Sequence, residues 1–250
     1  MALWFVLLNS TQSPDCRPNR NIPIIATMEK NDFTAEQKRV LLRAEDFVKE
    51  QLAGAEGGHD WWHVVRVRNA ARTLAQQEAV DAYVTELAAL LHDVADAKFY
   101  GGDEEKGPRL AGDFLEMQHV APEVREHVLN IIRHMSYKNS LEEQSFWSPE
   151  MAVVQDADRL DAIGAIGIAR AFNYGGFKNR SLYDPSVEPR LQMTKEEYKT
   201  SEAPTINHFY EKLLLLKDKM NTSAGRAKAN ERHDFMVRFL EQFFKEWGGE

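Results

Sequence analysis

The stretch Glu86–Phe99, ELAALLHDVADAKF, decides the fold class because it combines a buried helical pattern with ionisable side chains. Four apolar residues recur in it at helical spacing and predict a buried helix: Leu87, Leu90, Leu91 and Val94. His92, Asp93 and Asp96 interrupt this apolar run. A carboxylate buried there would cost several kcal/mol unless it were paired or bound a metal. We therefore expect a cation beside this helix.

The same combination recurs in two other segments. Asp156, Asp158 and Asp161 interrupt an apolar helical pattern in VVQDADRLDAIGAIGIA, and His63 precedes Arg66 by three residues in GHDWWHVVRV. The order of His63, the pair His92-Asp93 and Asp158, each on its own predicted helix, indicates a catalytic arrangement. Imidazole and carboxylate groups suit Mn²⁺, Fe²⁺, Ni²⁺, Co²⁺ or Mg²⁺ better than a closed thiolate zinc site.

Helical patterns dominate the rest of the chain. Thr34 with Gln37 forms a capping-box pattern, and Ser148-Pro149 is a favoured helix start. The predicted helices cover roughly residues 34–52, 60–74, 80–99, 122–138, 149–172, 206–220 and 229–247. No convincing strand alternation, internal repeat or Gly-rich phosphate loop is present in the sequence. The predicted fold class is all-α.

Composition excludes several classes of function. A chain of 250 residues with 43% hydrophobic residues can fill a core, and the net charge of −8 argues against a broad nucleic-acid-binding surface. Cys16 is the single cysteine, which excludes an intramolecular disulfide and a Cys-rich zinc cluster. We expect a reducing compartment and therefore a cytoplasmic protein.

The first residues form a separate segment in this interpretation. Ala2–Leu8 is apolar but too short to span a bilayer, and no positive charge precedes it. We expect residues 1–27 to be an unstructured extension, with an over-called start site as one explanation, and residues 28–250 to form a single domain. A cleaved export signal is the alternative, and no membrane partner is expected.

These motifs together resemble the HD-domain metal-dependent phosphohydrolase superfamily, whose pattern is H…HD…D. The resemblance covers about residues 58–176 and is closer to small bacterial HD hydrolases, through DWWH, the HDxxDxK continuation of His92, DADRLDAIGAIGIAR and the tail TINHFYEKLLLLKDKMNT. It implies a helical HD-domain globule with additional C-terminal helices. It also implies one divalent metal, with Mn²⁺ expected first, and these metal ligands: His63, His92, Asp93 and Asp158.

The resemblance also implies an activity. Some members of this subgroup hydrolyse nucleoside triphosphates, including deoxynucleotides, between the α- and β-phosphates, so we expect a nucleotide or another small phosphorylated compound as the partner. A nucleoside monophosphate phosphatase is the alternative within the enzyme class. A catalytically silent module that binds metal or nucleotide is the alternative of another class, and a homodimer stays open.

Other side chains receive weaker expectations. Asp96, on the same face as His92, is the expected general base or orienting residue for the attacking water. Candidates for phosphate binding, each of which could instead be a surface charge, are Arg66, Lys98, Lys138, Arg159, Arg170, Lys178 and Arg180. Arg66 could instead pair with a carboxylate of the same site. His127 and His134 are candidate ligands of a second metal bridged by Asp93, although a mononuclear site is favoured.

Two further features near His63 are interpreted structurally. Trp61 and Trp62 are expected to pack in the core more readily than to stack on a base. His59 and Asp60 are expected to shape the entrance of the site or to cap the helix that follows.

Overall fold

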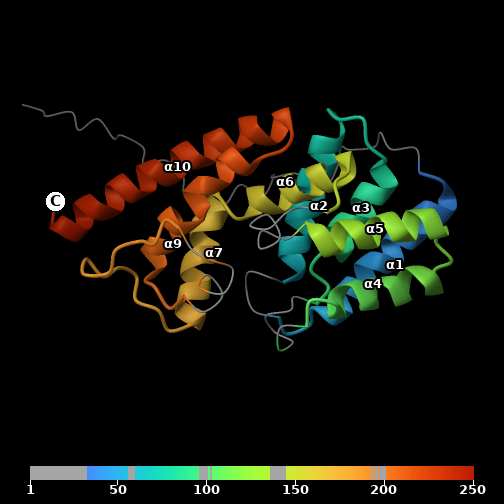
Figure 1. Ribbon diagram of the computed structural model, residues 1–250, viewed down its shortest axis with the longest axis horizontal. Helices are drawn as coiled ribbons and strands as arrows, with labels where there is room; N and C mark the ends of the chain where they lie inside the picture. Colours follow the sequence, from blue (N-terminus) through green and yellow to red (C-terminus); the bar gives the residue numbers. More distant parts are fainter. Residues whose placement is uncertain are drawn as a thin grey trace, which may run out of the picture. The chain divides into compact units, whose positions relative to one another are not determined.

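The computed structural model describes residues 33–55, 60–95, 101, 103–135, 145–192, 194, 197 and 201–250. Residues 33–250 belong to one compact unit, and every regular element in its described part is a helix (Figure 1). The predicted all-α fold class is confirmed. The boundary predicted at residue 28 stays a prediction, because it falls outside the described residues. None of the described helices has the length and apolar character needed to cross a membrane.

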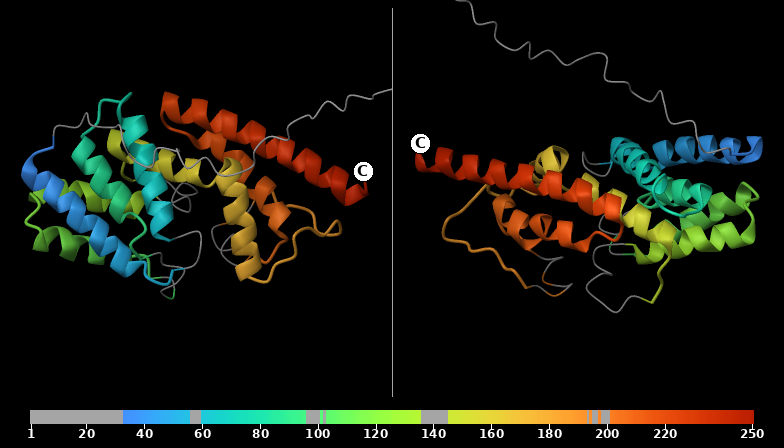
Figure 2. Two further views of the ribbon diagram at one scale, coloured as in Figure 1. Left: turned by 180° about the vertical axis from the view of Figure 1, so that it is seen from behind. Right: turned by 90° about the horizontal axis from the view of Figure 1, so that it is seen from above.

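The first group of helices surrounds a central one. Its members are α1 (Ala35–Gln51), α2 (Trp61–Ala75), α3 (Ala82–Leu91), α4 (Lys106–Met117), α5 (Pro122–His134) and α6 (Pro149–Asp161). Helix α3 packs against α1, α2, α5 and α6, and its residues from Tyr83 to Leu91 are all buried. Figures 1 and 2 show it enclosed by the other helices of this group. The apolar run that precedes His92 is therefore the centre of the core, and His92 follows it at the edge of that core.

The second group contains the C-terminal elements. It comprises α7 (Gly164–Phe177), α9 (Thr205–Glu211), the 3-10 helix η3 (Leu213–Lys219) and α10 (Ser223–Gly248). Helix α10 packs against α6, α7 and η3 (Figure 2). An aromatic cluster of Phe172, Phe209 and Phe239 joins α7, α9 and α10. The additional C-terminal helices expected from the sequence are present.

Three predicted helix starts are confirmed by their capping side chains. Thr34 and Gln37 exchange the two hydrogen bonds of a capping box, at 3.1 and 3.0 Å. The Ser148 hydroxyl accepts a hydrogen bond from the Met151 amide at 3.1 Å and starts α6. Asp60 caps α2 by accepting a hydrogen bond from the His63 amide at 3.0 Å. Of the two roles considered for Asp60, helix capping is therefore the one present.

The prediction of one continuous helix over residues 149–172 was wrong. The segment is two helices, because α6 ends at Asp161 and Gly164 takes a φ of +74°, which an L side chain rarely adopts. A Cβ at Gly164 would also lie 2.9 Å from the side chain of Arg232. The glycine therefore allows the chain to turn between α6 and α7 and lets α10 lie against that turn.

Other helix boundaries also differ from the predictions. The helix predicted over 206–220 is α9 followed by η3, because Lys212 has a φ of −144° and a ψ of −58° that no helix continues through. The predicted helix over 122–138 ends at His134 as α5. Helix α4 was not predicted, since its first turn contains Gly107 and Pro108, although proline is tolerated at a helix start.

Candidate metal centre

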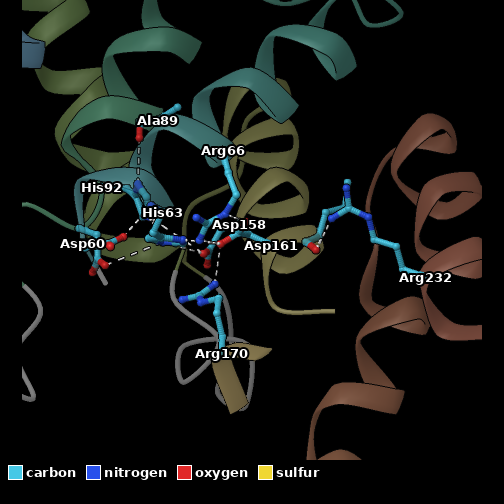
Figure 3. Close-up of polar contacts among 11 residues, drawn as sticks. Asp60, His63, Arg66, Ala89, His92, Asp158, Asp161, Arg170 and Arg232 are labelled. Carbon is cyan, nitrogen blue, oxygen red and sulfur yellow. Dashed lines mark hydrogen bonds and ion pairs between the residues drawn. The ribbon is translucent and has the colours of Figure 1, made fainter. Parts of the chain in front are cut away.

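Two histidines from different helices meet at the C-terminal end of α3. His63 lies in the first turn of α2, where the Asp60 cap fixes it, and His92 directly follows the last residue of α3. Their Nε2 atoms are 3.2 Å apart, and their rings meet edge to face with centroids separated by 5.2 Å (Figure 3). Two imidazole groups separated by 29 residues in the sequence therefore lie side by side.

The hydrogen-bond partners of the two rings assign their protons. His92 Nδ1 lies 2.9 Å from the Ala89 carbonyl oxygen, which can only accept, so this nitrogen carries hydrogen. His63 Nδ1 lies 2.7 Å from Asp161 Oδ2 and donates to that carboxylate. Burial lowers the pKa of His63 below its usual range, which keeps the ring neutral. In both rings Nδ1 is thus engaged by an acceptor, and Nε2 is the nitrogen that faces the other ring, an arrangement that fits a cation between them.

Carboxylates complete the donor set. Asp158 Oδ1 lies 3.6 Å from His63 Nε2 and 4.0 Å from His92 Nε2. Asp93 Oδ2 lies 3.9 Å from His63 Nε2. One ligand atom from each of His63, His92 and Asp158 lies within 4.8 Å of the others. The structure thus brings the four predicted ligands together, and two imidazoles with two carboxylates suit a divalent cation. Their role as ligands stays a prediction.

Asp161 is the residue of this site to which sequence reasoning gave no role. Its carboxylate accepts from His63 Nδ1, from Arg66 Nε at 2.6 Å and Nη2 at 3.0 Å, and from Arg170 Nη1 at 2.8 Å. Burial alone raises the pKa of Asp161, but the hydrogen bonds from His63 and Arg66 and the charge of Arg170 outweigh it and lower that pKa. Asp161 is therefore ionised. The signal available in the sequence was its position three residues after Asp158 in an apolar helix.

Comparison with known proteins identifies the family. The model of the HD domain matches residues 61–163, which contain all four predicted ligands. YpgQ of Bacillus subtilis is 38% identical over 205 residues, which are 81% of this chain and 91% of YpgQ. This chain belongs to the HD-domain family. The HD domain implies a divalent metal, and the cluster of His63, His92 and Asp158 could hold it.

Solved structures agree with the family assignment. An HD-superfamily hydrolase from Bacillus thuringiensis superimposes with a TM-score of 0.67 at 45% identity, over 86% of this chain and all of that protein. The crystal structure of Bacillus subtilis YpgQ in complex with ADP superimposes with a TM-score of 0.66, over 84% of this chain and 96% of that protein, with 32% identity in this comparison. Together with the HD domain, these neighbours support a metal-dependent phosphohydrolase, which confirms the predicted class of enzyme.

The described residues that were predicted to bind phosphate fall into three groups by their contacts. Arg66 and Arg170 both contact Asp161, so the alternative considered for Arg66, a pair with a carboxylate of the site, is present. The guanidinium of Arg159 donates to the Lys219 carbonyl and links α6 to η3. Lys178 and Arg180 lie beside aromatic rings at the end of α7, with Lys178 Nζ 5.3 Å from the Phe177 ring and the Arg180 guanidinium 5.7 Å from the Tyr174 ring.

The two candidate ligands of a second metal do not join the HD cluster. His127 Nε2 lies 2.9 Å from the Ser148 hydroxyl and 3.4 Å from Glu150 Oε2. His134 Nδ1 donates to the Asn130 carbonyl at 2.8 Å within its own helix. Both rings lie against Phe146. The structure therefore places these histidines against other partners, on α5 and at the start of α6.

The two tryptophans beside His63 differ in burial. Trp61 packs against the core, as expected, whereas Trp62 is 62% exposed and does not. Lys49 Nζ lies 4.8 Å from the Trp61 ring. Four residues with predicted roles lie outside the described residues, so their roles stay predictions: His59, Asp96, Lys98 and Lys138.

Proposed function

We propose that this HD-domain protein is a divalent-metal-dependent pyrophosphohydrolase that converts (deoxy)nucleoside triphosphates to monophosphates and pyrophosphate. The observation that supports the proposal most is the convergence of His63 and His92, whose Nε2 atoms are 3.2 Å apart, with Asp158 and Asp93 beside them. Two imidazoles and two carboxylates on separate chain segments are donors of the kind that hold a divalent cation.

The proposed metal ligands are His63, His92, Asp93 and Asp158, and the proposed metal is Mn²⁺. Mixed nitrogen and oxygen donors suit this ion, with Mg²⁺, Fe²⁺, Ni²⁺ and Co²⁺ as alternatives. When bound, such a cation would polarise a phosphoryl oxygen and make water a better nucleophile at neutral pH. Asp96 is proposed to orient or deprotonate the attacking water, since it follows His92 by four residues in the sequence.

The charges around the donor set support an anionic substrate. Asp161 shares its single negative charge between Arg66 and Arg170, so this group carries one net positive charge beside the proposed ligands. A phosphate group of the substrate would meet this positive charge, and guanidinium groups hydrogen-bond phosphate oxygens well. We propose Arg170 as a contact of the substrate phosphates.

A nucleotide is proposed as the substrate because the related YpgQ has been crystallised with ADP. In the proposed reaction, water attacks the α-phosphorus, the bond from that phosphorus to the bridging oxygen breaks, and pyrophosphate leaves. A nucleoside monophosphate phosphatase is the second candidate, since the same donor set would serve a phosphate ester. A cytoplasmic location stays a prediction, as does the choice between a monomer and a homodimer.

A product analysis tests this proposal. The purified protein is incubated with Mn²⁺ and nucleoside mono-, di- or triphosphates, and the released ion is identified as phosphate or pyrophosphate. We expect pyrophosphate from triphosphates, and no release by His92→Ala. Release of phosphate from monophosphates alone would favour the second candidate, whereas binding of Mn²⁺ and nucleotide without any hydrolysis would favour the silent module.

A further inference from the structure

We infer that Asp161 is a positioning residue that fixes the His63 ring for metal binding and holds Arg170 beside the metal centre. The inference rests on the proposed metal site but assigns a residue that the H…HD…D pattern does not contain. Asp161 is the last residue of α6 and is 5% exposed, and it reaches side chains of α2 and α7. Figure 3 shows these side chains converging on its carboxylate.

The contact with His63 defines which ring nitrogen is available to a metal. A carboxylate on Nδ1 keeps hydrogen on that nitrogen, so Nε2 keeps its lone pair and faces His92 Nε2. His63 is 1% exposed, so water has little access to replace this contact. Carboxylate partners of ligating histidines generally orient the ring, and their loss lowers metal affinity about 10- to 100-fold.

The two arginines on Asp161 are held differently. Arg66 uses Nε on Oδ1 and Nη2 on Oδ2, a two-point contact that fixes the plane of the carboxylate. Arg170 uses only Nη1, on Oδ2. Among the described residues, the Nε and Nη2 groups of Arg170 make no hydrogen bond, and its side chain is 17% exposed. The geometry therefore commits Arg66 to orienting Asp161 and leaves Arg170 with donors for an anion.

The chain offers a matched control on the same helix. Asp156 is also a buried aspartate of α6, 0% exposed, and its carboxylate accepts hydrogen bonds from Asn221 and Thr222 at the start of α10. No residue of the candidate metal centre contacts its carboxylate within the described part of the chain. Asp156→Asn therefore tests the general effect of removing a buried charge from α6.

The test measures metal affinity and ring protonation, without using turnover. Mn²⁺ affinity is measured by calorimetry for the wild type, Asp161→Asn, Asp161→Ala and Asp156→Asn. The protonated nitrogen of His63 is identified by ¹⁵N NMR of the metal-free protein. We expect a loss of about 10- to 100-fold in Mn²⁺ affinity for Asp161→Ala, a smaller loss for Asp161→Asn because its amide oxygen still accepts from Nδ1, and none for Asp156→Asn. We also expect His63 to shift toward a mixture of tautomers in Asp161→Ala.

The outcomes separate this inference from the proposed function. A wild type that does not bind Mn²⁺ or another divalent ion would overturn the proposed metal site itself. A wild type that binds, with Asp161→Asn and Asp161→Ala binding equally well and an unchanged His63 tautomer, would overturn the role of Asp161 alone. If Asp161→Ala fails to fold, the more conservative Asp161→Asn decides the question.

The two arginines provide the second half of the test. Inorganic pyrophosphate serves as the anionic probe, and its affinity is measured in the presence of saturating Mn²⁺. We expect Arg170→Lys to weaken pyrophosphate binding by about 10-fold with Mn²⁺ affinity unchanged, because lysine cannot reproduce the guanidinium geometry. Arg66→Lys should weaken Mn²⁺ binding in the same direction as Asp161→Asn. Equal effects of the two lysine variants on both probes would overturn the division of roles.

Discussion

Helix α6 carries two buried aspartates whose surroundings differ in kind. Asp156 accepts hydrogen bonds from the Asn221 amide, the Thr222 amide and the Thr222 hydroxyl, each at 2.8 Å. Asp161, five residues later, accepts from an imidazole and two guanidinium groups. Neutral donors suffice to hold a buried carboxylate in place, whereas charged donors leave a surplus of positive charge around it. The first arrangement joins two helices, and the second builds a site.

Helix α6 both packs against α10 and carries residues of the candidate site. Asp156 fixes the start of α10, where Gly225 is required because a Cβ there would lie 2.3 Å from the Asp156 carboxylate. With α10 fixed, the guanidinium of Arg232 reaches the Leu160 carbonyl at the end of α6, next to Asp161 (Figure 3). Asp156 and Arg232 thus join α6 to α10 at two separate points, neither of which is a proposed metal ligand.

The largest effect is expected from removing a proposed ligand. His92→Ala or Asp158→Ala should lower Mn²⁺ affinity by more than about 100-fold, because loss of a direct ligand costs more than loss of a residue that orients one. The pyrophosphohydrolase activity should disappear with the metal. Metal content after dialysis, measured by elemental analysis, checks this prediction. Stoichiometric Mn²⁺ in both variants would remove these residues from the ligand set. The end of α6 that carries Asp161 would then have no metal site to distinguish it from the part that carries Asp156.

The residues of this site could be predicted from the sequence, but the hydrogen bonds between them could not. The capping side chains of Thr34 and Ser148 were predictable because their hydrogen bonds lie within three residues along the chain. The order of His63, His92 and Asp158 identified the cluster because ionisable groups rarely interrupt an apolar helix. The contacts of Asp161 were not predictable, since His63 lies 98 residues away in the sequence and only the packing of α2 on α6 brings it near.

The breaks within predicted helices were missed for a related reason. The pattern from Pro149 to Phe172 is continuous in apolar spacing, and Gly164 and Gly167 are only weak interruptions. Gly164 takes a positive φ, and the Arg232 side chain of α10 occupies the space where its Cβ would lie. A contact with a residue 68 positions later is not visible in a local pattern.

Asp156→Ala should have the second largest effect, on stability alone. It would leave the Asn221 amide and the two Thr222 donors without their acceptor, and each buried donor left without a partner costs about 1–3 kcal/mol. We expect the free energy of unfolding to fall by about 3 kcal/mol in urea titrations. Mn²⁺ affinity of the folded protein should be unchanged. A variant of normal stability with weakened Mn²⁺ binding would show that the two aspartates do not have separate roles.

A smaller effect is expected from pH, through a histidine outside the candidate site. Desolvation of His208, together with the charges of Lys212 and Arg180, lowers its pKa to about 3. The unfolded chain, with a pKa near 6.5, therefore binds a proton that the folded state does not between pH 6.5 and 3. The contribution of neutral His208 to the free energy of unfolding is complete above pH 6.5 and is lost as the pH falls toward 3. The loss between pH 7 and 5 is at most about 2 kcal/mol.

His208→Gln isolates this contribution, because glutamine is neutral at every pH. Asp161 also contributes acid sensitivity through its lowered pKa, but its share is the same in both proteins. We expect the melting temperature of His208→Gln to fall less steeply than that of the wild type between pH 7 and 5. Parallel curves would indicate that His208 takes up its proton in the folded protein as readily as in the unfolded chain.

The smallest effect is expected at the N-terminal end of α6. Ser148→Ala removes the acceptor of the Met151 amide and should cost about 1 kcal/mol, a typical value for a lost helix cap. It also removes the hydroxyl that contacts His127 Nε2, leaving Glu150 as its neighbour. Ser148→Thr keeps a capping hydroxyl and serves as the matched control. Thermal unfolding should show a loss of about 2–4 °C for the alanine variant only.

The same variant also tests the second metal considered for His127 and His134. Ser148 precedes Asp158 by ten residues, which is about 15 Å along a helix, so a lost cap should leave the candidate centre intact. We therefore expect one Mn²⁺ per chain and normal turnover from Ser148→Ala. Because His127 would lose a hydrogen-bond partner, any metal bound through it should respond to the substitution. A wild type with two equivalents of Mn²⁺, of which Ser148→Ala loses one, would extend the metal chemistry to both ends of α6.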